Sequence, residues 1–187
     1  MSALNLSTLA IALGTFAGGI NLYGVLKPAA FGAAARKFPR YTPVGWVLML
    51  LATAWFLYYV SQESVADFTS MKSIFYLLFG AIGVGSCLFV KDYLAVRGLA
   101  AVLLLLAKLM VDTSRPHLGD TKWMLVIQAW AYVMVAAGIW FTVSPWRCRD
   151  LINWATATEQ RTRLLSGVRL AFALLVLALG LTVFRAS

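Results

Sequence analysis

Residues 93–112 read YLAVRGLAAVLLLLAKLMVD, and this stretch is the clearest indication of the fold. Apart from Arg97 and Lys108, every residue from Leu94 to Val111 is apolar or glycine. The hydrocarbon core of a bilayer needs about 20 mostly apolar residues for one helical crossing. The stretch therefore predicts a transmembrane helix, because lipid offers no hydrogen-bond partner to an unpaired backbone.

Five further stretches of the 187-residue chain have the same length and character. None alternates apolar and polar residues as a membrane β-strand does. The sequence predicts an all-α fold, a polytopic membrane helical bundle with six transmembrane helices in a single domain, 1–187. The predicted spans are 5–26, 42–61, 72–90, 93–112, 122–144 and 166–184.

The overall composition supports a membrane protein. Hydrophobic residues make up 61% of the chain and charged residues 12%, whereas a soluble domain has roughly 45–50% and about a quarter. The chain has too few polar groups to cover a water-facing surface, which excludes a soluble enzyme and a disordered tail. The two cysteines, Cys87 and Cys148, lie in an apolar run and a basic loop, so no disulfide framework is expected.

The positive charges indicate an orientation. The net charge is +9, and the clustering of Lys and Arg in loops between apolar runs favours lipid headgroups over nucleic acid as the partner. Both termini are predicted to lie outside, since the side with more basic residues faces inward. The first span is expected to be retained, because no Lys or Arg precedes residue 27 to form a signal-peptide n-region. This orientation leaves five of the 16 basic residues outside: Lys72, Lys108, Arg115, Lys122 and Arg185.

Two basic segments on the inner side begin with Pro28 and Pro145, and both are expected to form short amphipathic helices. Two interpretations fit them. The segments either set the membrane topology alone, or they also dock anionic headgroups or a partner protein. The candidate contact residues are Arg36, Lys37, Arg40, Arg147 and Arg149.

Small residues four apart form ladders on the first and third spans: Ala10, Gly14 and Gly18, then Ala81 and Gly85. Such ladders let helix backbones approach closely in lipid. They serve packing within the bundle or contact with another subunit, and packing within the bundle is the commoner outcome.

The span centres contain no Asp, Glu or His, which argues against a proton-coupled carrier. Asn21 and Gln128 are the polar residues of interest. They are interpreted as interhelical hydrogen-bond partners, or as the start of a midplane polar site in a transporter.

Enzyme and cofactor signatures are missing from the sequence. The single histidine, His117, lies in an outer loop with Asp112 and Asp120, and no paired ligand motif accompanies them, so no metal site is predicted. One histidine cannot provide bis-histidine haem ligation, and no phosphate loop is present. No catalytic residue and no cofactor is predicted.

An internal repeat is visible at three glycines that open the second helix of each pair: Gly45, Gly98 and Gly167. It indicates three hairpins that run from outside to inside and back, and a tight Lys91-Asp92 turn joins the middle pair.

The last hairpin resembles a known family. Gly138-Ile139, Pro145-Trp146-Arg147 and the run 163–167 are similar to the small bacterial inner-membrane hairpin proteins of the YjeT type, over about a quarter of the chain. The resemblance implies a bacterial inner (cytoplasmic) membrane and supplies no activity.

Three functions remain open. The favoured one is a non-catalytic membrane subunit or scaffold that binds lipids, other membrane subunits or a second copy of itself. The alternative is a small transporter or channel, and the third is a membrane-embedded lipid enzyme.

Overall fold

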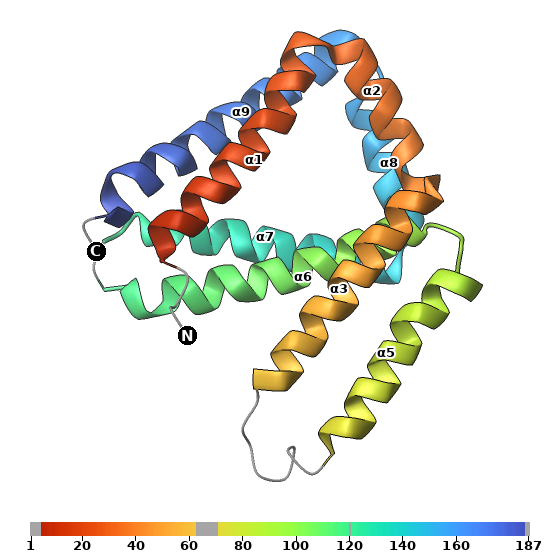
Figure 1. Cartoon of the computed structure of the whole chain (residues 1–187). Coiled ribbons are helices and arrows are strands. Elements are labelled where there is room, and N and C mark those ends of the chain that lie inside the picture. The colour runs from red at the N-terminus through yellow and green to blue at the C-terminus, as the bar shows by residue number, and fades with distance from the viewer. Residues whose placement is uncertain (1–4, 63–70, 120, 186–187) are drawn as a thin grey trace. The chain divides into compact units, whose positions relative to one another are not determined.

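The computed structural model describes residues 5–62, 71–119 and 121–185, and these residues form helices and no strands (Figure 1). The all-α prediction is therefore confirmed for this part of the chain. The α-helices are α1 (Leu6–Leu26), α2 (Pro28–Lys37), α3 (Thr42–Gln62), α5 (Lys72–Phe89), α6 (Leu94–Ser114), α7 (Met124–Val143), α8 (Pro145–Ala155) and α9 (Glu159–Leu181). Short 3-10 turns are η1 (Phe38–Arg40), η2 (Arg115–His117) and η3 (Val183–Arg185).

Six of these helices are long and apolar enough to cross a membrane: α1, α3, α5, α6, α7 and α9. Large apolar side chains point away from the protein along them. Phe16 is 71% exposed, Leu77 78% and Phe89 85%. Apolar surface on this scale is unfavourable in water and favourable against lipid tails. The chain is thus a multi-pass membrane protein.

Proline explains the breaks between the long helices and the short ones. Lys27 and Ser144 lie outside regular helix, directly before Pro28 and Pro145. Steric contact with a proline ring disfavours the helical conformation at the preceding residue. The ring itself suits the first turn of a new helix, so α2 and α8 begin where the sequence predicts short helices.

The last long helix begins earlier than expected. The predicted span starts at residue 166, whereas α9 starts at Glu159. Thr158 caps the helix, and its side-chain oxygen accepts a hydrogen bond from the Arg161 N–H at 3.2 Å. Thr and an acidic first-turn residue are favourable at a helix start, so the helix continues beyond its apolar part.

The chain divides into two compact units. Unit 1 comprises Met1–Arg36, Leu106–Val135 and Asp150–Ser187, and unit 2 comprises Lys37–Leu105 and Ala136–Arg149. The core of unit 1 is made by buried apolar side chains of α1, the second half of α6, the first half of α7, α9 and η3. Its fully buried members include Met110, Met124, Val176 and Phe184.

In unit 1, α1 packs along α9 in antiparallel orientation (Figure 1). The Ser7 hydroxyl donates to the Gly180 carbonyl at 2.8 Å, near the start of α1 and the end of α9. The opposite ends meet as well, because a Cβ at Gly24 would lie 2.4 Å from Ser166 Oγ. The two helices are therefore in contact along most of their length.

In unit 2, α3 packs along α5, and Phe56 and Phe79 lie with ring centroids 4.7 Å apart. The start of α3 also meets the start of α6. A Cβ at Gly45 would lie 2.8 Å from the Ala95 nitrogen, and one at Gly98 2.8 Å from the Met49 nitrogen. These two glycines, which mark the internal repeat, allow the two backbones to approach closely.

In both units, the helices that pack together belong to different hairpins of the predicted repeat. The second helix of the first predicted pair, α3, packs on the first helix of the second pair, α5. The second helix of the last pair, α9, packs on the first helix of the first pair, α1. The described contacts therefore join helices of different predicted hairpins.

Candidate functional site

The basic residues that the sequence singles out lie on α2, η1 and α8. Arg36 and Lys37 end α2, Arg40 ends η1, and Arg147 and Arg149 lie in the first half of α8. Four of them are exposed, and Arg149 is half-buried. The structure places them in two different settings, one in each unit.

In unit 1, Arg36 binds the end of α8. Its Nη1 donates to the Thr156 carbonyl at 2.7 Å and contacts the Thr156 hydroxyl oxygen at 3.2 Å. The carbonyls of the last helical turn lack partners within the helix, and a basic side chain satisfies them favourably. Gly32 lies against the same threonine, because a Cβ there would be 3.4 Å from Thr156 Cβ. This contact fixes α2 against the end of α8.

In unit 2, three residues from separate elements meet at one aromatic ring. Arg149 Nη1 donates to the Tyr93 hydroxyl at 3.1 Å. The Arg40 guanidinium carbon lies 5.9 Å from the centre of the Tyr93 ring, within the range of a cation–π interaction. We refer to Arg40, Tyr93 and Arg149 as the Tyr93 cluster. It gathers two of the five predicted contact residues.

The backbone of Tyr93 is unusual. Its φ is +54°, and it is the one non-glycine residue with positive φ among those described. A bulky side chain is disfavoured in this left-handed region. The Tyr93 carbonyl accepts hydrogen bonds from the Val96 and Arg97 N–H groups, both at 3.0 Å, and so starts α6. The conformation ends the tight turn predicted at Lys91-Asp92.

Tyr93 and Thr156 were not among the predicted site residues, although Tyr93 contacts Arg40 and Arg149 and Thr156 contacts Arg36. A signal was present for Tyr93, because it directly follows the predicted Lys91-Asp92 turn and begins the predicted span 93–112. No local sequence signal marks Thr156 as a hydrogen-bond partner of Arg36, since 120 residues separate them. Contacts of this kind depend on the three-dimensional packing.

The small residues of α1 lie at its contact with α9. Ala10, Gly14 and Gly18 are buried. A Cβ at Gly14 would lie 2.9 Å from both the backbone nitrogen and Cβ of Leu177, and one at Gly18 3.9 Å from Ala173 Cβ. The ladder thus faces another helix of the same chain.

For Ala81 and Gly85 on α5, the described residues show no packing within the bundle, and the alternative of contact with another subunit stays a prediction. Ala81 is exposed, and a Cβ at Gly85 would meet no described atom within 4 Å. The packed residue is Gly83, where a Cβ would lie 2.1 Å from Thr53 Oγ1. It stands two residues from both, so it points to a different side of the helix.

Asn21 and Gln128 are the intramembrane polar residues. Asn21 is buried, and its Nδ2 donates to the Ala17 carbonyl at 2.8 Å within α1. The interhelical bond expected for Asn21 is therefore replaced by a bond within its own helix. Gln128 is half-buried on α7. The two residues occupy different helices of unit 1.

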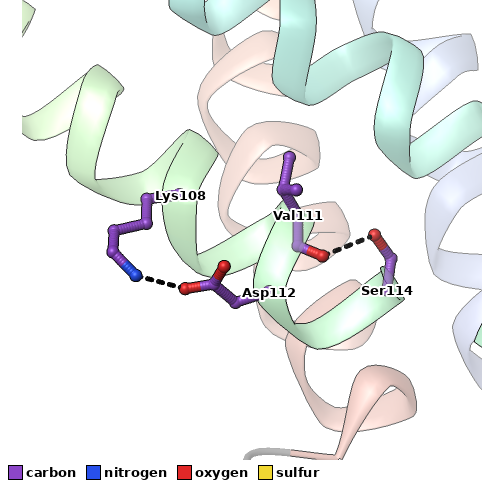
Figure 2. A network of polar contacts seen from close by, with 4 residues as sticks. All are labelled: Lys108, Val111, Asp112 and Ser114. Atoms are coloured by element: carbon purple, nitrogen blue, oxygen red, sulfur yellow. Dashed lines mark hydrogen bonds and ion pairs between the residues drawn. The ribbon is translucent and has the colours of Figure 1, made fainter. Parts of the chain in front are cut away.

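The far end of α6 carries a small polar network (Figure 2). Lys108 forms an ion pair with Asp112, and the Ser114 hydroxyl donates to the Val111 carbonyl at 3.3 Å. Asp112 is therefore bound to a lysine of its own helix, while His117 ends η2 and Asp120 lies outside the described residues. Within 5–62, 71–119 and 121–185, no three His, Cys, Asp or Glu side chains group as metal ligands.

Comparison with other proteins adds no assignment. The chain matches no protein-family model, no curated protein and no solved structure. The resemblance of the last hairpin to the YjeT-type proteins stays a prediction. The membrane helices and their basic ends are therefore the features that bear on function.

Proposed function

We propose that this protein is a non-catalytic integral membrane subunit that holds anionic phospholipid headgroups against its basic segments α2, η1 and α8. In this proposal it resides in a bacterial inner membrane, with both termini outside and the basic segments at the inner surface. The proposal rests on one observation above all: the basic residues of these segments are mostly exposed at the ends of apolar helices.

The electrostatic argument gives the scale of the effect. Each Lys or Arg near an anionic membrane surface contributes about 1 kcal/mol. Because the attraction falls off within a Debye length of about 8–10 Å, it acts only on headgroups beside the protein. Basic segments at the ends of apolar helices satisfy that condition.

The exposed apolar helix faces support the subunit part of the proposal. Large side chains such as Leu125, Val133 and Leu164 are more than half exposed. In a membrane such faces contact either lipid tails or another helix. The predicted partners are membrane lipids and other membrane subunits or a second copy of this chain.

The test replaces three exposed basic residues together: Arg36→Gln, Lys37→Gln and Arg147→Gln. The protein is released from nanodiscs of phosphatidylglycerol and phosphatidylcholine, and native mass spectrometry counts the phosphatidylglycerol molecules that it retains. The expected result is weaker retention, by roughly fivefold for each charge removed.

A matched control removes the same charge from the other ends of the helices: Lys72→Gln, Lys122→Gln and Arg185→Gln. This variant should retain more phosphatidylglycerol than the variant of α2 and α8, because its three charges lie far apart in the sequence and are not clustered on basic segments. Equal retention by both triple variants and the unmodified protein would contradict the proposal.

A further inference from the structure

We propose that the Tyr93 cluster and Arg97 together form a discrete binding site for the phosphate group of an anionic phospholipid. The proposal rests on the proposed function and deepens it. It assigns a single phosphate to defined donors rather than to a diffuse basic surface.

The first observation is the convergence of positive charge. Arg40 and Arg149 come from different elements, and Tyr93 draws both guanidinium groups to its ring and hydroxyl. Like charges held near one another repel, and a bound anion relieves that repulsion. Arginine is suited to phosphate, because its planar group presents several N–H donors to the phosphate oxygens.

The second observation is a buried donor without a partner. Arg97 is half-buried, and its Nε–H is buried without a hydrogen-bond acceptor among the described residues. Leaving such a donor unpaired is unfavourable, so buried polar groups are normally satisfied by protein, water or a ligand. A phosphate oxygen is an acceptor of the required kind.

The positions of these residues agree. The Arg97 N–H donates to the Tyr93 carbonyl at 3.0 Å, so Arg97 lies in the first turn of α6, directly after Tyr93. Ala100 and Leu104 follow Arg97 by three and seven residues on one face of α6, and both lie against Gly138 of α7. Because α8 follows α7 directly, this face of α6 is directed toward the elements that carry Arg149. All of these residues belong to unit 2.

The strained residue fits the same site. Tyr93 keeps a positive φ that a glycine would adopt more readily. Residues in such conformations concentrate at functional sites, where the surrounding structure maintains them. The side chain that this conformation positions is the one that Arg40 and Arg149 contact. The positive end of the α6 dipole also favours an anion at this end of the helix.

The location favours a lipid as the carrier of the phosphate. α6 is one of the six apolar helices, and it begins at Leu94, next to Tyr93. The cluster therefore lies at the end of a membrane span, at the depth of phospholipid headgroups. Trp146, which is 47% exposed on α8, is typical of this depth.

The experiment measures binding of one phosphatidylglycerol molecule by native mass spectrometry, in variants Arg97→Gln, Arg149→Gln and Tyr93→Phe. Arg97→Gln and Arg149→Gln should each lower the affinity of the tightest lipid by roughly tenfold or more, with a smaller loss for Tyr93→Phe. Arg97→Lys keeps the charge but lacks the Nε–H, so it should restore only part of the affinity.

The matched control is Arg163→Gln, which removes an exposed charge from α9 in the other unit. It should leave the tightest lipid bound as in the unmodified protein. Thermal unfolding in detergent verifies that each variant is folded. Loss of affinity by Arg97→Gln no greater than that of Arg163→Gln would overturn the proposal.

A second arm distinguishes a lipid from a soluble phosphate. Inorganic phosphate is titrated against the lipid-free protein, and it should neither raise the unfolding temperature nor displace phosphatidylglycerol at concentrations that leave the ionic strength nearly unchanged. Displacement of the lipid by inorganic phosphate would overturn the assignment to a lipid.

Failure of this site and failure of the proposed function give different results. If the triple variant of α2 and α8 loses phosphatidylglycerol but Arg97→Gln does not, the discrete site is wrong and the proposed function stands. If neither variant changes retention, both are wrong.

Discussion

Gly14 and Gly19 lie on the same helix and differ in what surrounds them. A side chain at Gly14 would be driven into the backbone of α9, 2.9 Å from the Leu177 nitrogen. A side chain at Gly19 would meet no described atom within 4 Å. The close contact between α1 and α9 therefore depends on the first glycine and is independent of the second.

We expect Gly14→Ala to destabilise the protein by about 1–3 kcal/mol, because the added methyl group forces the packed helices apart. The control, Gly19→Ala, should be neutral or stabilising by up to about 1 kcal/mol, since alanine favours helix more than glycine does. Thermal unfolding in detergent measures both. Equal melting temperatures for the two variants would show that α1 does not pack on α9 through Gly14.

Cys148 provides a prediction about pH. Burial raises the pKa of its thiol to about 11, and the residue is 4% exposed on α8. A raised pKa lowers the thiolate fraction at neutral pH, and the thiolate is the reactive form. In a Cys87→Ser background, maleimide should label the folded protein slowly at pH 7, and the labelling rate should continue to rise above pH 9.

The control for Cys148 is a cysteine at the exposed position 146, introduced as Trp146→Cys in a chain that lacks both native cysteines. Its labelling should be fast at pH 7, since its pKa stays near the usual value of about 8.5. Equal labelling rates at Cys148 and at this position would contradict the burial of Cys148.

Single residues were predictable from sequence only in part. The ladder of Ala10, Gly14 and Gly18 could be recognised because small residues recur on one face of α1. On α5 several glycines stand close together, so spacing alone did not identify Gly83 as the residue that meets Thr53. Which glycine is packed depends on which helix faces α5, and no local sequence pattern shows the facing helix.

At the scale of elements, the short helices α2 and α8 arise from two prolines. Pro28 and Pro145 end one helix and begin another, and the more polar residues after each proline set these segments apart from the spans. The start of α9 was placed seven residues late, because the prediction followed the apolar run and gave no weight to the Thr158 cap. A helix can extend beyond the hydrocarbon that its apolar part crosses.

The docking of α2 on α8 can be tested with a cross-link. The Cβ position at Gly32 lies 3.4 Å from Thr156 Cβ, close to the separation of about 3.5–4.5 Å found in disulfides. In a chain without native cysteines, Gly32→Cys with Thr156→Cys should form a disulfide upon mild oxidation. Mass spectrometry of the peptides then identifies the linkage.

A matched pair keeps one partner and moves the other. Gly32→Cys with Trp154→Cys places the second thiol on an exposed part of α8, and it should remain reduced under the same conditions. Efficient cross-linking of both pairs, or of neither, would contradict the described contact between α2 and α8.

At the scale of the whole molecule, the sequence predicts the number of membrane helices and their approximate ends. The number and ends of these helices were predictable because the hydrocarbon core requires long apolar runs, and the length of each run is visible in the sequence. The partners of each helix were not predictable. Helices such as α1 and α7 are apolar around their whole circumference, so no apolar stripe indicates which side faces the protein.

The proposed orientation places α2 and α8 on one side of the membrane and both termini on the other. Single cysteines introduced as Ala35→Cys, Ala157→Cys, Gln62→Cys or Lys122→Cys in a cysteine-free chain test it directly, using an impermeant maleimide on intact spheroplasts. We expect labelling at positions 62 and 122 in intact spheroplasts, and labelling at positions 35 and 157 only after the membrane is permeabilised. Labelling of position 35 or 157 in intact spheroplasts would contradict it.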